Sequence, residues 1–240
     1  MQSKYPKDTS SPVPIFVGGV SFGGLVAAHA CASARKYGVS FAGCVLVAPC
    51  CDVEWTPLLR FQASIGSLLA KVAPDVRGAA AVTPERLSSD AAAIAAYVGD
   101  PLVRVANVRF LAAVEIMKGF EALRKDTFFD ESHFGTTPLL VMHGTNDAAC
   151  FFPASEAFVQ KARGSDKTFV AIENGSHLLL HDAATAKTTR DEICAFVRSR
   201  AEAFRASHEK GRASERRRAL TDSRGVAVTE AAEVDIGARL

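Results

Sequence analysis

Gly19-Val20-Ser21-Phe22-Gly23 is the segment of this chain that says most about its fold. It follows an apolar, β-branched run over residues 13–18 and precedes an alanine-rich segment that reaches Tyr37, so it predicts a strand, a tight turn and a helix. A serine at the apex of such a turn, with a glycine two residues away on each side, is the nucleophile-elbow pattern. The glycines are expected because the chain packs closely against itself there. The pattern exposes the Ser21 hydroxyl and directs the Phe22 amide, at the helix N-terminus, towards a developing oxyanion.

Three further apolar runs predict buried strands, over residues 44–49, 138–143 and 168–172. Residues 154–163 and 183–204 have apolar side chains at helical spacing. Strands that alternate with helices in this way indicate a parallel sheet with right-handed crossovers. The predicted fold class is therefore α/β, with a mostly parallel sheet.

Residues 53–134 break this alternation. They contain no convincing strand and three helical segments, over residues 55–72, 84–98 and 101–123. An insertion of this size between two strands predicts a helical cap over the carboxyl edge of the sheet. Its first segment has more apolar side chains than one buried stripe requires, so most are interpreted as cap core, with an acyl-binding cleft as the alternative for some. These side chains are Trp55, Leu58, Leu59, Phe61, Ile65, Leu68 and Leu69.

The composition becomes polar from about Ser207. We therefore expect one domain over residues 1–206, which includes the cap, and a tail over residues 207–240 that is a frayed helix followed by disorder. The basic cluster of Arg212 and residues 216–218 is interpreted as part of this solvated tail, with contact to an anionic membrane surface as the alternative.

Composition narrows the function classes. A chain of 240 residues allows one domain with a sizeable core, and a net charge of +2 argues against a nucleic-acid partner. No apolar run is long enough to cross a bilayer, and the N-terminus has no secretory leader pattern. The six cysteines fall at no spacing typical of a metal site, so they are interpreted as reduced, buried thiols of a cytoplasmic protein. The sequence indicates no cofactor and no metal.

The residues that carry chemistry follow the predicted strands. A serine hydroxyl is a weak nucleophile until a base takes its proton, and a histidine held by a carboxylate is suited to that task. Asp147 follows the strand at 138–143, and His177 follows the strand at 168–172. Because the carboxyl ends of parallel strands meet at one edge of a sheet, we predict a triad of Ser21, Asp147 and His177 there. The order serine, acid, histidine is the one that accompanies this elbow.

Other histidines and acids are weaker candidates on position. His181 competes as the base but lies further from its strand end, and His143 lies on a strand, where a hydrogen-bonded structural role is expected. His29, on the predicted elbow helix, is expected to be packed or on the surface. The remaining candidates lack an orienting neighbour or a place just past a strand: His133, His208, Asp166, Asp182 and Glu173.

Taken together, these motifs resemble the monoacylglycerol lipase and lysophospholipase branch of the α/β-hydrolases, often called the serine aminopeptidase S33-like group. The resemblance runs from about Pro14 to Arg200, and Tyr97-Val-Gly-Asp-Pro-Leu102 is the segment that separates this branch from generic esterases. The matching segments are residues 14–24, 43–49, 97–102, 138–147, 165–167 and 175–177.

The resemblance implies a partial α/β-hydrolase fold in which the helical insertion is the lid. It also implies hydrolysis of carboxylic esters of lipid-like substrates such as monoacylglycerol, with a small lipid-like ester as the binding partner. The implied mechanism is an acyl-enzyme on Ser21, with His177 as the base and Asp147 orienting it. Peripheral membrane contact of an otherwise cytoplasmic protein is compatible with such a substrate.

Two departures from the family pattern stand out. Phe151 and Phe152 replace a second acidic residue that members usually carry after the acid, which changes a loop but leaves the triad intact. The family's first strands and its His-Gly-x-Gly segment, which completes the oxyanion hole, have no room upstream of Ser21. We therefore expect an exposed apolar edge at residues 13–17, and a fragment that is poorly stable and weakly active or inactive.

Two hypotheses of different class follow. The first is a serine hydrolase of the monoacylglycerol-lipase type that lacks its N-terminal part. The second is a catalytically impaired fragment or pseudoenzyme of the same fold, which acts at most as a binding module. The presence of Ser21, Asp147 and His177 together favours the first hypothesis.

Overall fold

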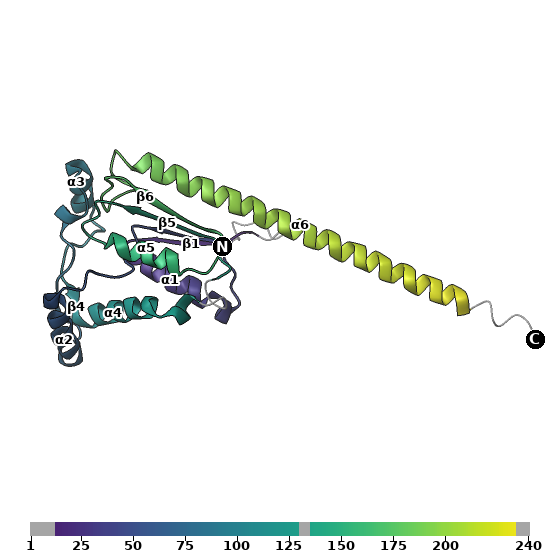
Figure 1. The fold of residues 1–240 in the computed structure, drawn as a ribbon, viewed down its shortest axis with the longest axis horizontal. Helices are drawn as coiled ribbons and strands as arrows, with labels where there is room; N and C mark the ends of the chain where they lie inside the picture. Colours follow the sequence, from purple (N-terminus) through teal and green to yellow (C-terminus); the bar gives the residue numbers. More distant parts are fainter. Residues whose placement is uncertain (1–12, 130–134, 234–240) are drawn as a thin grey trace, which may run out of the picture. The chain divides into compact units, whose positions relative to one another are not determined.

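The computed structural model of this chain describes residues 13–129 and 135–233, with side chains up to residue 215. Its centre is a sheet of four strands in the order β1-β2-β5-β6, in which every neighbouring pair is parallel (Figure 1). The strands are β1 (Phe16–Val20), β2 (Gly43–Val47), β5 (Leu139–Gly144) and β6 (Lys167–Ile172). The predicted α/β class with a mostly parallel sheet is confirmed.

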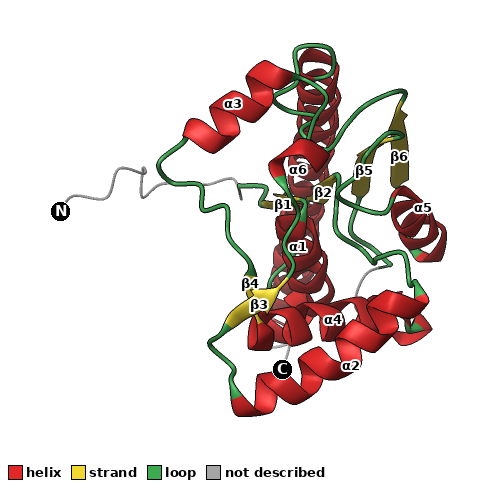
Figure 2. Cartoon of the chain, turned by 90° about the vertical axis from the view of Figure 1, so that its left-hand side faces the viewer, coloured by secondary structure: helices red, strands yellow, loops and turns green. Residues whose placement is uncertain are grey.

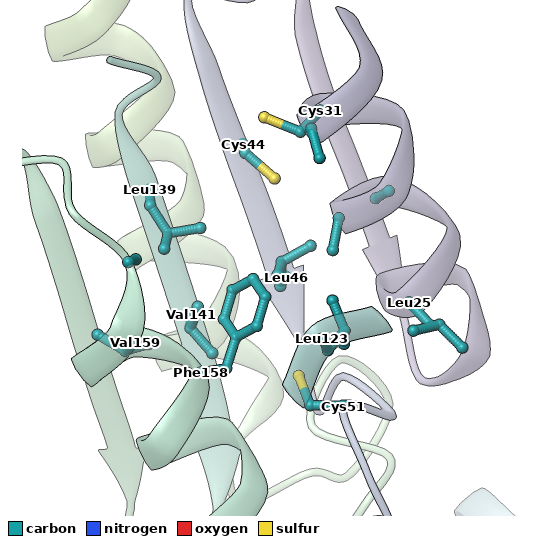
Figure 3. Close-up of a cluster of buried hydrophobic side chains, with 14 of the residues drawn as sticks. Leu25, Cys31, Cys44, Leu46, Cys51, Leu123, Leu139, Val141, Phe158 and Val159 are labelled. Atoms are coloured by element: carbon teal, nitrogen blue, oxygen red, sulfur yellow. The ribbon is translucent and has the colours of Figure 1, made fainter. Parts of the chain in front are cut away.

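Helices cover both faces of the sheet because side chains of the inner strands alternate between two cores. Leu46 of β2 and Val141 of β5 belong to the core on the side of the elbow helix, whereas Val47 and Met142 belong to the opposite core. Figure 3 shows the first core, in which Leu25 and Phe158 approach the sheet from two different helices. These helices are α1 (Phe22–Ser33), continued by a 3₁₀ turn over Ala34–Tyr37, and α5 (Phe152–Lys161).

The two central strands differ from the first strand in burial. Every residue of β2 and β5 is buried, as their continuous apolar runs predict. Within the described residues β1 pairs with β2 alone, so Ile15 and Val20 are exposed. The apolar run that forms β1 is therefore not fully buried, although its composition suggested that it would be. The expectation of an exposed apolar edge at residues 13–17 is confirmed.

The cap contains a short element that the sequence did not reveal. A two-stranded antiparallel sheet joins β3 (Arg77–Ala79) to β4 (Val108–Arg109) (Figure 2). A Cβ atom on Gly78 would lie 2.2 Å from the Phe110 ring, so a larger residue there would require this ring to move. These strands are too short to give a periodic pattern in the sequence. The helix that was predicted from residue 101 begins only at Phe110, directly after β4.

The cap helices also differ from one another in burial. They are α2 (Pro57–Val72), α3 (Ala91–Gly99) and α4 (Phe110–Arg124), and α3 is preceded by a 3₁₀ turn over Pro84–Arg86. Phe120 and Leu123 of α4 enter the sheet core, whereas α2 buries no residue. The cap-core interpretation is therefore wrong for four side chains of α2, which are exposed: Leu58, Phe61, Ile65 and Leu68.

The last helix is longer than its predicted end near Phe204. It is α6 (Ala186–Glu233), and Ile193, Phe196 and Val197 pack against the sheet as their spacing predicts. Residues 15–198 form one compact unit, and residues from 199 onwards belong to another. Residues 207–233 are helical where a frayed helix followed by disorder was expected, because their many Ala, Arg and Glu residues favour a helix. The side chains of residues 216–218 lie outside the described part.

Candidate active site

Ser21 lies in the turn between β1 and α1, with a backbone φ of 54°. Such a positive φ is strained for a serine and is held by hydrogen bonds on both sides. The Ser21 N–H donates to the Val47 carbonyl at 3.0 Å, and the Ser21 carbonyl accepts from the amides of Gly24 at 2.9 Å and Cys50 at 3.0 Å. The backbone of neighbouring elements therefore fixes the elbow.

The glycines of the elbow have unequal roles. A Cβ atom on Gly19 would lie 2.0 Å from the Gly23 carbonyl oxygen, so this position requires glycine. A Cβ atom on Gly23 would meet nothing within 4 Å, whereas one on Gly24 would lie 2.7 Å from the Pro49 Cβ. Close packing of the chain therefore explains Gly19 and Gly24, and the expected explanation is wrong for Gly23.

Asp147 and His177 come together on the loops that follow two neighbouring strands. His177 Nδ1 lies 2.8 Å from Asp147 Oδ2, and the side chains of both residues are buried. The other oxygen, Asp147 Oδ1, accepts from the amides of Ala149 and Cys150 at 2.8 Å each. The carboxylate therefore has a fixed orientation with one oxygen directed at the imidazole.

Asp147 and His177 can pair because the loops that carry them are in close contact. A Cβ atom on Gly144, at the end of β5, would lie 2.2 Å from the Gly175 carbonyl oxygen. That same carbonyl accepts from the Asn146 amide at 2.9 Å. Glycine at position 144 is therefore required for the loop of Asp147 to approach the loop of His177.

His143 is a neighbour of the acid that the sequence assigned only a structural role. Its ring is fully buried, and Nδ1 hydrogen-bonds with Ser155 Oγ at 2.7 Å, which agrees with that assignment. Its Nε2 also lies 3.0 Å from Asp147 Oδ2, without the alignment of a hydrogen bond. Burial disfavours ionisation of Asp147, but the adjacent imidazoles of His143 and His177 outweigh it and hold the pKa of this carboxyl below its ordinary value.

Two cysteines surround the serine, and the sequence interpretation missed both. Ser21 Oγ lies 3.9 Å from Cys150 Sγ, and within the described residues no hydrogen bond joins Ser21 to His177. The Cys50 thiol hydrogen-bonds with the Cys150 thiol, which lowers the pKa of Cys50 and, together with burial, raises the pKa of Cys150. The only signal in the sequence is the place of Cys150 three residues after Asp147.

Comparison with known proteins supplies the family. The chain matches the protein family "Serine aminopeptidase, S33" over residues 2–184. It belongs to this family of hydrolases. It is similar to the human monoglyceride lipase, with 24% identity over 179 residues, which cover 75% of this chain and 54% of the relative. An uncharacterised abhydrolase domain-containing protein of Dictyostelium discoideum is 29% identical over 169 residues, which cover 69% of this chain and 17% of that protein.

Solved structures agree with the family at the level of the fold. A soluble variant of the Saccharomyces cerevisiae monoglyceride lipase, crystallised with a substrate analogue, superposes with a TM-score of 0.68 at 20% identity and covers 78% of this chain and 62% of that one. The monoacylglycerol lipase of Paleococcus ferrophilus gives a TM-score of 0.67 at 21% identity, with coverage of 78% and 69%. The chain spans about half the length of the human relative it matches.

In this chain of the S33 family, the remaining histidines and acids considered as base or acid do not contact the pair of Asp147 and His177 in the hydrogen bonds described below. His181 is exposed, and His29 Nε2 hydrogen-bonds with the Gly119 carbonyl at 3.2 Å, so it is packed as expected. His208 Nδ1 hydrogen-bonds with the Phe204 carbonyl at 3.1 Å. His133 lies outside the described residues. Asp182 is buried and bonded to two serines, Ser88 and Ser176.

The same cluster offers atoms of the kind that ligate metals. Asp147, Cys150 and His177 each place one such atom within 4.8 Å of the others. Both Asp147 oxygens, however, already accept hydrogen bonds from His177 and from two amides. The arrangement is therefore suited to orienting an imidazole for proton transfer.

Within the described part of the chain, no helix is long and apolar enough to span a bilayer.

Proposed function

We propose that this chain is a serine hydrolase that cleaves carboxylic esters of lipid-like substrates such as monoacylglycerol. The observation that carries the proposal is the 2.8 Å contact between His177 Nδ1 and Asp147 Oδ2 at the sheet edge where the Ser21 elbow also ends. A buried carboxylate on one ring nitrogen leaves Nε2 of the histidine as the atom that receives a proton. Ser21 is the hydroxyl on that edge with the strained backbone of an elbow.

The proposed reaction has two halves. His177 accepts the proton of Ser21 as the hydroxyl oxygen attacks the ester carbonyl, and then protonates the departing alcohol, which leaves an acyl group on Ser21. Water, activated by the same histidine, releases the acid. Asp147 stays ionised and stabilises the imidazolium, a role supported by the two amide hydrogen bonds on its other oxygen.

The Phe22 amide is the proposed donor to the oxyanion. Phe22 is the first residue of α1, where backbone amides have no acceptor within the helix. Removal of one oxyanion donor reduces turnover by about 100- to 1000-fold.

The substrate class rests on similarity and on the cap. Two of the similar proteins with solved structures are named monoglyceride or monoacylglycerol lipases. The exposed apolar stripe of α2 supports an apolar substrate, because such a surface favours contact with acyl chains or with a lipid surface. We also propose that this stripe makes peripheral contact with membranes: Leu58, Phe61, Ile65, Leu68 and Val72.

Vesicle flotation separates this membrane contact from non-specific adhesion. Replacement of Phe61 and Leu68 by Asp should abolish co-flotation with phosphatidylcholine vesicles. Leu102→Asp is the matched control, because Leu102 is 92% exposed but lies outside the stripe. Equal loss of flotation in both variants would exclude α2 as the contact.

One contact favours the alternative, a catalytically impaired binding module of the same fold. The Ser21 hydroxyl faces the Cys150 thiol at 3.9 Å and has no hydrogen bond to His177 among the described residues. If this arrangement persisted with substrate, His177 would not activate the serine. Under this alternative the chain would bind a lipid ester without cleaving it.

A fluorophosphonate probe separates the two functions, because it reacts only with an activated serine. We expect the folded chain to be labelled and Ser21→Ala to remain unlabelled. Release of fatty acid from a monoacylglycerol should disappear in the same variant. A folded chain that binds the lipid ester but resists the probe would support the binding module.

A further inference from the structure

Asp182 is a buried carboxylate outside the proposed triad, with 5% of its surface exposed. Its Oδ1 accepts a hydrogen bond from Ser88 Oγ at 2.6 Å, and its Oδ2 accepts one from Ser176 Oγ. A buried charge is retained only where hydrogen bonds compensate for lost water. The two serines provide this compensation from two segments that lie far apart in the sequence.

Ser176 connects Asp182 to the proposed base, because it directly precedes His177. The Asp182 amide also donates to the Leu178 carbonyl at 2.9 Å, and the His181 amide donates to the same carbonyl at 2.8 Å. Asp182 therefore holds the histidine loop on both sides of His177, by its carboxylate before that residue and by its backbone after it.

Ser88 connects Asp182 to the cap, because it lies just before α3. Two further contacts join the same two segments. The Leu178 amide donates to the Leu87 carbonyl at 3.0 Å, and the Ala183 amide donates to Asp90 Oδ2 at 3.3 Å. Within the cap segment, the Ser88 hydroxyl accepts from the Asp90 amide at 2.8 Å. The opposite oxygen of Asp90 accepts from two amides in the first turn of α3. A continuous hydrogen-bond network therefore joins the start of α3 to the loop that carries His177.

An apolar cluster strengthens this connection. Leu87, Ala93 and Leu178 are buried together, with Tyr97 and Ala149 packed against them. Leu178 directly follows His177, and Ala149 lies in the turn that holds the Asp147 carboxylate. The two turns that carry the proposed acid and base therefore both pack against α3.

We infer that Asp182 is a positioning residue, which through Ser176 and Ser88 fixes His177 and ties its position to the α3 end of the cap. The catalytic meaning of this inference rests on the proposed function, whereas its structural content does not. A displacement of α3 would move the histidine loop, while a displacement of α2 would leave it in place. The cap would then act on catalysis through α3.

The test compares variants of this network by a signal from His177 itself. The chain has six histidines, so the Cε1–H resonance of His177 can be assigned in histidine-labelled protein by its loss in His177→Gln. We expect this resonance to shift and broaden in Asp182→Asn and Ser176→Ala, and to shift less in Ser88→Ala. Thr189→Ala is the matched control, because Thr189 is fully buried and its hydroxyl donates to the Thr185 carbonyl rather than to Asp182, Ser176 or Ser88.

Kinetics supply a second measurement on the same proteins. Misplacement of a base by about 1 Å reduces rates by about 100-fold. We expect fluorophosphonate labelling to slow by about 10- to 100-fold in Ser176→Ala and Asp182→Asn, with near wild-type rates in Thr189→Ala.

The outcomes separate the inference from the proposed function. An unchanged His177 resonance in folded Ser176→Ala and Asp182→Asn overturns the inference, as does an equal change in Thr189→Ala. An unlabelled wild-type chain overturns the proposed function, and the resonance then still decides the positioning role. If Asp182→Asn does not fold, Ser176→Ala and Ser88→Ala decide it.

Discussion

The two halves of the candidate site are held in place by different means. Asp147 and His177 lie on the loops after β5 and β6, which pair directly, and their side chains are buried and hydrogen-bonded to each other. Ser21 lies after β1 at the open edge, where backbone hydrogen bonds fix the turn but the hydroxyl contacts only a thiol within the described residues. The proposed acid–base pair is therefore preorganised by side chains, and the proposed nucleophile by its backbone.

Activity and stability should therefore be coupled in one half of the site and separable in the other. A change to Asp147 alters a buried polar network, because its carboxylate accepts hydrogen bonds from an imidazole and two amides. A change to the Ser21 hydroxyl removes a single weak contact with a thiol.

Asp147→Asn should reduce the rate of Ser21 labelling by about 10⁴-fold, because the amide no longer holds His177 in the reactive tautomer. It should also lower the free energy of unfolding by about 3 kcal/mol, the scale for disruption of a buried charged pair. Urea unfolding and labelling kinetics check the two effects. Ser21→Ala should lose labelling without loss of stability, and Asp191→Asn, at an exposed ion pair, should change neither. Equal stability loss in Ser21→Ala would contradict the contrast.

The stability of the acid–base half should depend on pH. The pKa of Asp147 is below its ordinary value in the folded chain, so its stabilising contribution is complete above the unfolded pKa of about 4 and is lost as pH falls below it towards the folded pKa. Urea unfolding between pH 3 and pH 7 gives the free energy of unfolding of wild type and of Asp147→Asn. The difference between the two free energies should become smaller below about pH 4. A difference of constant size would show that ionisation of Asp147 does not contribute.

The nucleophile half should respond to its backbone. Gly19→Ala should lower the free energy of unfolding by about 1–3 kcal/mol, because the new Cβ overlaps the Gly23 carbonyl. Gly23→Ala should be neutral or stabilising by up to about 1 kcal/mol, because that position is helical and open. Thermal or urea unfolding of the two variants checks this order. Equal destabilisation would mean that the elbow glycines act together.

The smallest expected effect concerns the thiols beside Ser21. Cys50 is half-buried and has a lowered pKa, whereas burial raises the pKa of its neighbour Cys51 to about 12. Iodoacetamide at pH 8 should therefore modify Cys50 at least about tenfold faster than Cys51, as measured by peptide mass spectrometry. The exposed Cys194 is the internal standard. Modification of Cys51 at the rate of Cys50 would contradict this assignment.

The sequence predicts those parts of the molecule that depend on local patterns. Local sequence predicts the buried strands β2 and β5, through their apolar runs, and the need for glycine at position 19 of the elbow. Asp147 and His177 were predicted because strand ends share one edge, and the structure brings them to 2.8 Å.

The remaining features depend on tertiary contacts that no local pattern carries. His143 and Cys150 lie beside Asp147 and Ser21 only once β5 and its following turn have packed. Asp182 is a weak candidate for the acid by sequence because it does not directly follow a strand. Its partner Ser88 is 94 residues away, so their contact exists only in the folded chain. The apolar side chains of α2 were interpreted as cap core, and only the fold reveals that several of them, such as Phe61 and Leu68, are exposed.

The most direct test of the central claim asks whether His177 activates Ser21 despite the absence of a hydrogen bond between them in the described structure. The measurement is the rate of fluorophosphonate labelling of the folded wild-type chain and of His177→Gln, with the labelled peptide mapped. We predict a label on Ser21 that forms at least about 1000-fold faster in wild type than in His177→Gln. Equal rates in the two proteins, or a label on another residue, would contradict it.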